Sequence, residues 1–118
     1  MPQTRTVTYE EWIAMPEVTD AIEEVVHGEI RITPPAKSRH ARIVQRLNRS
    51  LDRQLDPDRT LLLSSSFGLV TRKQPLTSRT PDLALWHADS VIEEDGYFLS
   101  APQLVVEVLS PGNTRRER

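Results

Sequence analysis

Two carboxylates stand in apolar surroundings, where a charged side chain is costly. Glu107 lies inside the run Leu104-Val105-Val106-Glu107-Val108-Leu109, and Asp82 directly follows Pro81 at the start of a short apolar segment. A buried carboxylate without a partner is strongly unfavourable, so Glu107 must be protonated, paired, at an edge or bound to a cation. Two carboxylates on neighbouring strands can hold a hard divalent cation such as Mg²⁺, with water in the other positions. An Asx turn for Asp82 and a salt bridge to an arginine for Glu107 are the structural alternatives.

A second group of residues suits the binding of phosphates. Arg42, Arg46, Arg49 and Arg53 follow one another at intervals of three or four residues, so on a helix they form one basic stripe, called here the arginine stripe. Residues 37–53 hold six Lys and Arg against one acid, whereas residues 82–107 hold six acids and neither Lys nor Arg. This asymmetry fits an anionic ligand held beside a metal-binding cluster, or two solvated faces of opposite charge.

Composition excludes several other classes of protein. The 118 residues allow one domain, and 15 Lys+Arg against 17 Asp+Glu argue against a polycation that coats nucleic acid. The chain has no cysteine, which excludes disulfides and thiolate metal sites. It has no apolar run of membrane-spanning length and no apolar leader, so we expect no membrane contact and a cytoplasmic location. No Gly-rich phosphate loop, zinc-ligand spacing or nucleophile elbow is present.

The first part of the chain predicts a short helix and a hairpin. Thr8 and Glu11 form a capping-box pattern, which predicts the start of a helix. Pro16 predicts the end of that helix. Strand-like runs at residues 22–26 and 29–32 flank His27-Gly28, which suits a tight turn.

The rest of the chain predicts one long helix and three strands. Apolar residues at a spacing of four indicate an amphipathic helix over residues 40–55. Strands are expected at residues 61–70, 81–86 and 103–109, with a polar turn at 71–80. The last strand is nearly all apolar, as for a strand covered on both faces. The expected fold is therefore a single α+β domain.

These pieces resemble a known family. Pro81-Asp82, followed by Val106-Glu107-Val108-Leu109-Ser110-Pro111, is similar to the PD-(D/E)XK nuclease superfamily and, more closely, to a large family of uncharacterised bacterial proteins described as restriction endonucleases. Residues 24–30 resemble that family's opening hairpin, residues 34–40 the entry to its first helix, and residues 102–107 the strand that delivers the second acid. The resemblance covers nearly the whole chain in the correct order.

The resemblance implies roles for particular residues. Asp82 and Glu107 would be catalytic carboxylates that bind a divalent metal, Mg²⁺, and Glu24 a further acidic contributor near the site. His40 would start the first core helix, either facing the site or capping and packing the helix. The arginine stripe and His40 would contact DNA. The implied fold is a restriction-endonuclease-like α-β-β-β-α-β core, in which the long helix is followed by a three-stranded mixed sheet.

The sequence departs from the family at the lysine that orients the attacking water. Leu109 stands two residues after Glu107, and Lys37 and Lys73, the only lysines, are not in the expected place. The family usually supplies this lysine from a helix after the Ser-Pro turn, and here residues 114–118 resemble only the start of that helix, where Arg115, Arg116 or Arg118 could offer charge. We therefore expect a truncated domain that lacks the final helix and strand.

Two functions follow from these observations. The first is a metal-dependent DNA endonuclease, inactive or weakly active in this form. The second is a non-catalytic remnant that serves as a nucleic-acid-binding or protein-interaction module. Apolar strand surface left uncovered predicts a homo-oligomer in either case.

Overall fold

The computed structural model describes residues 6–18, 20–35, 37–64 and 67–109. The Ser110-Pro111 turn and the helix start expected at residues 114–118 lie outside these ranges. In chain order the elements are α1 (Tyr9–Ile13), β1 (Ile22–Val26), β2 (Glu29–Thr33), α2 (Ser38–Asp52), β3 (Thr60–Ser64), β4 (Leu69–Lys73), β5 (Leu76–Arg79), β6 (Leu83–His87), the 3₁₀ turn η1 (Ala88–Ser90), β7 (Glu93–Glu94), β8 (Tyr97–Phe98) and β9 (Leu104–Val106).

The short first helix has the predicted capping box. The Thr8 hydroxyl accepts a hydrogen bond from the Glu11 backbone N–H at 3.1 Å, and the Thr8 N–H donates to Glu11 Oε1 at 2.9 Å. These bonds satisfy two backbone donors in reciprocal fashion at the start of α1. The helix is held in place because it buries Tyr9 and Trp12.

The larger of the two sheets has six strands, in the order β2-β1-β5-β4-β8-β7. The predicted hairpin is confirmed as β1 and β2, and His27 and Gly28 in its turn have φ of 50° and 84°. β4 and β8 run parallel and the other pairs antiparallel, so the sheet is mixed. A second sheet has the order β3-β6-β9, and both of its pairs are antiparallel.

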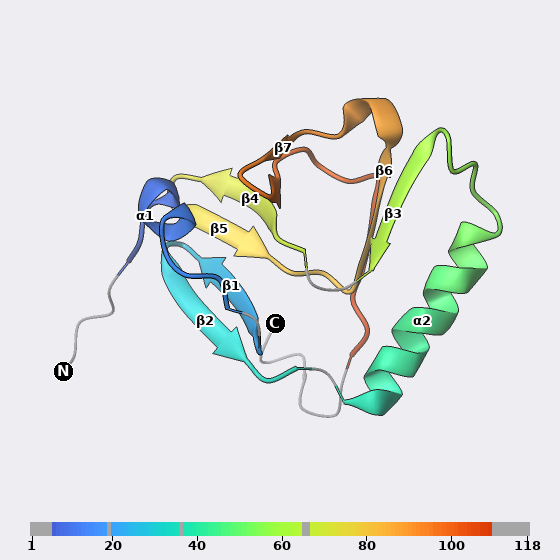
Figure 1. The fold of residues 1–118 in the computed structure, drawn as a ribbon, viewed down its shortest axis with the longest axis horizontal. Helices are drawn as coiled ribbons and strands as arrows, with labels where there is room; N and C mark the ends of the chain where they lie inside the picture. Colours follow the sequence, from blue (N-terminus) through green and yellow to red (C-terminus); the bar gives the residue numbers. More distant parts are fainter. Residues whose placement is uncertain (1–5, 19, 36, 65–66, 110–118) are drawn as a thin grey trace.

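Strand β4 shows how the layers are stacked. Val70 packs with Tyr9 and Trp12 of α1, whereas the preceding Leu69 packs with Trp86 of β6. Since successive side chains of a strand point to opposite faces, the six-stranded sheet carries α1 on one face and the three-stranded sheet on the other. In Figure 1, α2 lies beyond β3, on the side away from α1. The expected α+β class, with the long helix leading into a three-stranded sheet, is confirmed, but the described strands of that sheet are all antiparallel, whereas a mixed sheet was expected.

Two boundaries expected between residues 61 and 80 are wrong. The single strand expected at 61–70 is two strands in different sheets, β3 and β4. Gly68 precedes β4, and a Cβ atom there would lie 2.6 Å from the Tyr97 ring, so this backbone passes too close to β8 for any larger residue. The turn expected at 71–80 is mostly the hairpin β4–β5, in which Leu76, Thr77 and Ser78 are buried. The sequence did not predict this strand because its residues are mostly polar, and only tertiary contacts bury them.

The last strand differs from its expected environment. β9 is an edge strand of the three-stranded sheet, and its Leu104 and Val105 are 41% and 44% exposed. The expectation that this strand is covered on both faces is therefore wrong for the described residues. α2 begins at Ser38 and ends at Asp52, two to three residues earlier than predicted, and buries Val44 while Ile43 and Leu47 are partly exposed.

Candidate active site

The carboxylate of Asp82 is held by two segments that are remote in sequence. Asp82 immediately precedes β6, and its Oδ1 lies 2.9 Å from Nε2 of His40, the third residue of α2. Its Oδ2 accepts a hydrogen bond from the Val108 backbone N–H at 2.7 Å. The side chains of His40 and Asp82 are 13% and 20% exposed, so solvent reaches the pair only in part. Long-range contacts, rather than an Asx turn, hold this carboxylate.

The pairing of β6 with β9 brings the two predicted acids to corresponding positions. The antiparallel register sets Leu83 opposite Val106 and Ala84 opposite Val105. One step further along the same register, Asp82 corresponds to Glu107. Residues opposite one another in an antiparallel pair lie on the same face of the sheet. Glu107 itself is exposed and makes a polar interaction, so it is edge-exposed rather than buried.

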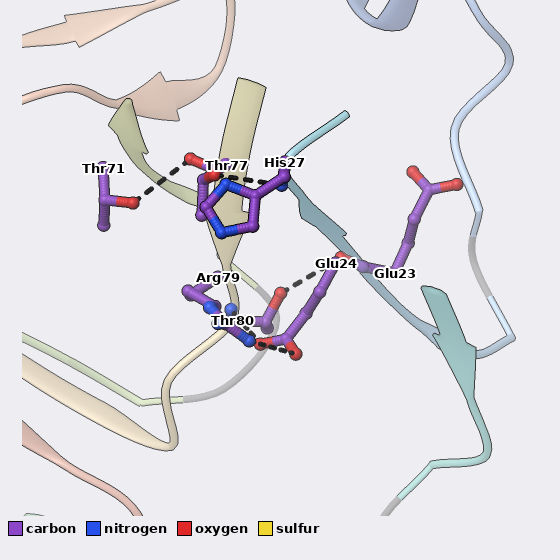
Figure 2. Close-up of polar contacts among 7 residues, drawn as sticks. All are labelled: Glu23, Glu24, His27, Thr71, Thr77, Arg79 and Thr80. Carbon is purple, nitrogen blue, oxygen red and sulfur yellow. Dashed lines mark hydrogen bonds and ion pairs between the residues drawn. The ribbon is translucent and has the colours of Figure 1, made fainter. Parts of the chain in front are cut away.

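Glu24 reaches the same region through the connection between β5 and β6. Figure 2 shows its carboxylate beside Thr80 and Arg79: Oε2 accepts the Thr80 backbone N–H at 2.7 Å, and Oε1 lies 3.9 Å from Arg79 Nη1. The Thr80 hydroxyl also donates to the Glu23 carbonyl at 3.3 Å. Glu24 therefore fixes the backbone two residues before Asp82.

The donor set suits a hard cation with few protein ligands. Within the described ranges, no group of three or more His, Cys, Asp or Glu side chains is arranged to hold a metal ion. Each Asp82 oxygen accepts one contact, and a carboxylate oxygen has two lone pairs, so both keep acceptor capacity. Mg²⁺ is commonly bound by one or two carboxylates and several waters, which Asp82 and Glu107 match in ligand type.

The arginine stripe lies on the exposed surface of α2. Arg42, Arg46, Arg49 and Arg53 are all exposed, and none forms an ion pair with another described residue. Arg46, Arg49 and Arg53 line, with Asp52, an open hollow of about 420 Å³. Their guanidinium groups are available to anions. By contrast, Trp86 is fully buried against Phe67 and Phe98, so its ring is not available to stack on a base.

Three contacts of the site could not be predicted from the residues that adjoin them in the sequence. Thr80, Arg79 and the Val108 N–H meet the predicted acids only because strands from different parts of the chain pair. If the two predicted strands had been paired with each other, their register would have placed Val108 close to Asp82. Nothing near Glu24 in the sequence pointed to Thr80.

In the part of the chain that the structure describes, no helix is both long and apolar enough to cross a membrane.

Comparison with known proteins gives a family and a related solved structure. The Uma2 family model, described as "Putative restriction endonuclease", matches residues 8–118. A similar solved structure is that of "a putative nuclease belonging to DUF820" from Anabaena variabilis ATCC 29413, with a TM-score of 0.74 and 22% identity over 94% of this chain. The present chain spans 63% of that protein's length. At this identity the likeness concerns the fold. No curated protein sequence matches the chain.

Proposed function

The chain belongs to the Uma2 family of restriction-endonuclease-like proteins, and from that premise we propose that it is a metal-dependent endonuclease of the PD-(D/E)XK type, which hydrolyses DNA in the cytoplasm. One observation carries the proposal: Asp82, with its carboxylate held by His40 and Val108, corresponds in the β6–β9 register to Glu107. Two oxygen-donor side chains at the end of one strand pair suit a divalent cation that is bound by one or two carboxylates and several waters.

The chain's own residues would divide the work as follows. Asp82 and Glu107 would hold Mg²⁺, which when bound polarises a phosphodiester and lowers the pKa of a bound water. His40 and the Val108 N–H orient the Asp82 carboxylate, so little reorganisation is needed when a cation binds. Glu24 accepts a hydrogen bond from the Thr80 backbone and so fixes the segment that leads into Asp82.

The arginine stripe would supply affinity for the substrate. Exposed guanidinium groups neutralise backbone phosphates and contribute binding that does not depend on base sequence. We propose that Arg42, Arg46, Arg49 and Arg53 contact the DNA backbone, with His40 at the end of the stripe nearest Asp82.

We expect the rate of hydrolysis to be low. Leu109 stands at the position where the motif has its lysine. Loss of a group that positions the attacking water commonly costs about 10²–10⁴ in rate. The alternative is a non-catalytic nucleic-acid-binding module. It uses the same arginine stripe and needs no residue at the position of Leu109 to orient a water molecule.

Cleavage of supercoiled plasmid with and without Mg²⁺ tests the proposal. We expect slow nicking that stops on chelation of the metal and in Asp82→Asn and Glu107→Gln. The matched control is Asp89→Asn, because Asp89 is an exposed acid in η1, outside the site. Binding of duplex DNA without any Mg²⁺-dependent nicking would reject the nuclease and favour the binding module. Nicking that persists in Asp82→Asn would reject the site.

A further inference from the structure

Arg79 is the exposed end of a strand that is otherwise buried. β5 lies between β1 and β4, and its first three residues are buried, whereas the Arg79 side chain is 48% exposed. The β4–β5 register sets Arg79 opposite Leu69, so the two side chains lie on the same face of the sheet. Leu69 is buried in a cluster with Trp86 of the three-stranded sheet. The cover that this sheet provides therefore ends between Leu69 and Arg79, and the arginine reaches solvent.

A short and firmly held segment joins Arg79 to the candidate site. The Thr80 N–H donates to Glu24 Oε2 at 2.7 Å, and the Thr80 hydroxyl donates to the β1 backbone at 3.3 Å. Pro81 is fully buried, and its ring fixes φ. Asp82 follows directly, and three residues of chain span at most about 11 Å. The fold therefore sets Arg79 beside the approach to Asp82, within reach of a nucleic-acid strand that passes this carboxylate.

The Arg79 guanidinium keeps most of its capacity to donate hydrogen bonds. Among the described residues its polar partner is Glu24, whose Oε1 lies 3.9 Å from Nη1, a distance too long for a hydrogen bond. Figure 2 shows the two side chains next to one another. An exposed pair at this distance contributes little to stability. A guanidinium carries five N–H donors in a planar fork that matches a phosphate group, so Glu24 orients Arg79 without occupying it.

We infer that Arg79 binds a backbone phosphate of the DNA strand that passes Asp82. The inference rests on the proposed function and adds a second element that contacts the substrate. α2 approaches Asp82 through His40 and carries the arginine stripe, whereas β5 leads into Asp82 along the chain. Phosphate contacts from two elements fix the orientation of a duplex without reading its bases. Arg79 is therefore a substrate-binding residue that aligns the strand with the carboxylates.

Binding of a short duplex in Ca²⁺, followed by fluorescence anisotropy at several salt concentrations, tests the inference whether or not the protein cleaves. Arg79→Gln should weaken binding by about threefold to tenfold and flatten the slope of log affinity against log salt by about one unit. Its Tm should equal that of the parent, because the pair with Glu24 is exposed. Arg79→Lys should retain part of the affinity, since it keeps the charge.

Two further variants separate phosphate binding from a role as the partner of Glu24. Glu24→Gln should not weaken binding, because it removes a negative charge from beside the phosphate. Equal losses of affinity in Glu24→Gln and Arg79→Gln would show that only the ion pair matters and would overturn the inference. Arg31→Gln is the matched control and should bind like the parent. Arg31 also lies opposite Glu24, but on β2, the outer strand two places from β5.

Chemical modification locates the contact directly. Phenylglyoxal modifies arginine side chains, and mass spectrometry identifies those that duplex DNA protects. We expect DNA to protect Arg79 but not Arg31. Equal modification of Arg79 with and without DNA would overturn the inference. So would an unchanged salt slope in Arg79→Gln while Arg46→Gln with Arg49→Gln flattens it, a result that leaves the proposed function intact. A parent that does not bind duplex DNA at low salt would overturn both.

Discussion

At the scale of single residues, the structure depends on one close approach at Gly68. A Cβ atom on this residue would lie 2.6 and 2.9 Å from two carbons of the Tyr97 ring, and that ring stacks on Trp12 with centroids 4.3 Å apart. Because Trp12 is 3% exposed, the ring has little room to retreat.

We therefore predict that Gly68→Ala lowers the free energy of unfolding by about 1–3 kcal/mol, the usual cost of overpacking. Urea unfolding measures the change. In a Tyr97→Leu background the same substitution should cost clearly less, because the obstructing ring is gone. An equal cost in both backgrounds would show that the ring is not the obstacle.

A polar cluster around Tyr9 predicts how stability depends on pH. Hydrogen bonds from Lys73 and from the Tyr9 hydroxyl hold the pKa of Glu94 below its ordinary value. Burial, with the carboxylates of Glu94 and Asp95 beside the hydroxyl, raises the pKa of Tyr9.

A lowered pKa in the folded state means that Glu94 stabilises the protein above its unfolded-state pKa, and that this contribution disappears as the pH falls through the folded-state pKa. We predict that Glu94→Gln lowers stability at pH 7 and that this deficit shrinks as the pH falls toward 3, as measured by urea unfolding across this range. Glu93→Gln, on the same short strand, is the control and should behave like the parent at both pH values. A Glu94→Gln effect of equal size at pH 3 would contradict this account.

At the scale of elements, α2 connects two parts of the proposed function. Its first turn contacts Asp82 through His40, and its exposed side carries the arginine stripe. One helix thus links the candidate site to the surface that would bind phosphates.

If the stripe holds phosphates, Arg46→Gln with Arg49→Gln should weaken binding of duplex DNA. The slope of log affinity against log salt should flatten by about one unit per lost contact. Fluorescence anisotropy at several salt concentrations measures both quantities. Arg31→Gln with Arg72→Gln removes the same charge from exposed positions on β2 and β4 and should have a smaller effect. If the two pairs of substitutions had equal effects, the arginine stripe would be an ordinary solvated surface and not a site for phosphates.

At the scale of the whole molecule, β9 is the exposed margin of the three-stranded sheet. Leu104 and Val105 point to opposite faces, yet both are more than 40% exposed. An apolar edge strand without Lys or Pro is a surface on which further strands can pair. We propose that the 118 residues form one domain, because β4 contributes residues to both core clusters.

We predict that the protein forms homo-oligomers, detected by size-exclusion chromatography with light scattering. Val105→Lys should shift the population toward monomer, because a charge on an edge strand opposes pairing. Ile92→Lys is the control, since Ile92 is 58% exposed but lies outside the three-stranded sheet. A monomeric parent, or oligomers that Val105→Lys leaves unchanged, would reject β9 as the contact.

The sequence by itself determined the elements whose signals are local. The Thr8–Glu11 capping box, the hairpin around His27-Gly28 and the amphipathic α2 were all predictable, because each depends on contacts between residues close in the chain. The resemblance to nucleases followed from motifs spread along the chain. Asp82 and Glu107 were recognisable as candidates because a carboxylate in an apolar strand is costly.

Only the tertiary structure decided how these parts meet. Thr77 and Ser78 look like turn residues, yet they are buried in β5 because β1 and β4 pair with it on either side. The contact of His40 with Asp82 joins residues 42 positions apart, and the bond from Thr80 to Glu24 joins residues 56 apart. Such contacts leave no period or spacing in the sequence, since they arise from strand register and from the packing of one layer on another.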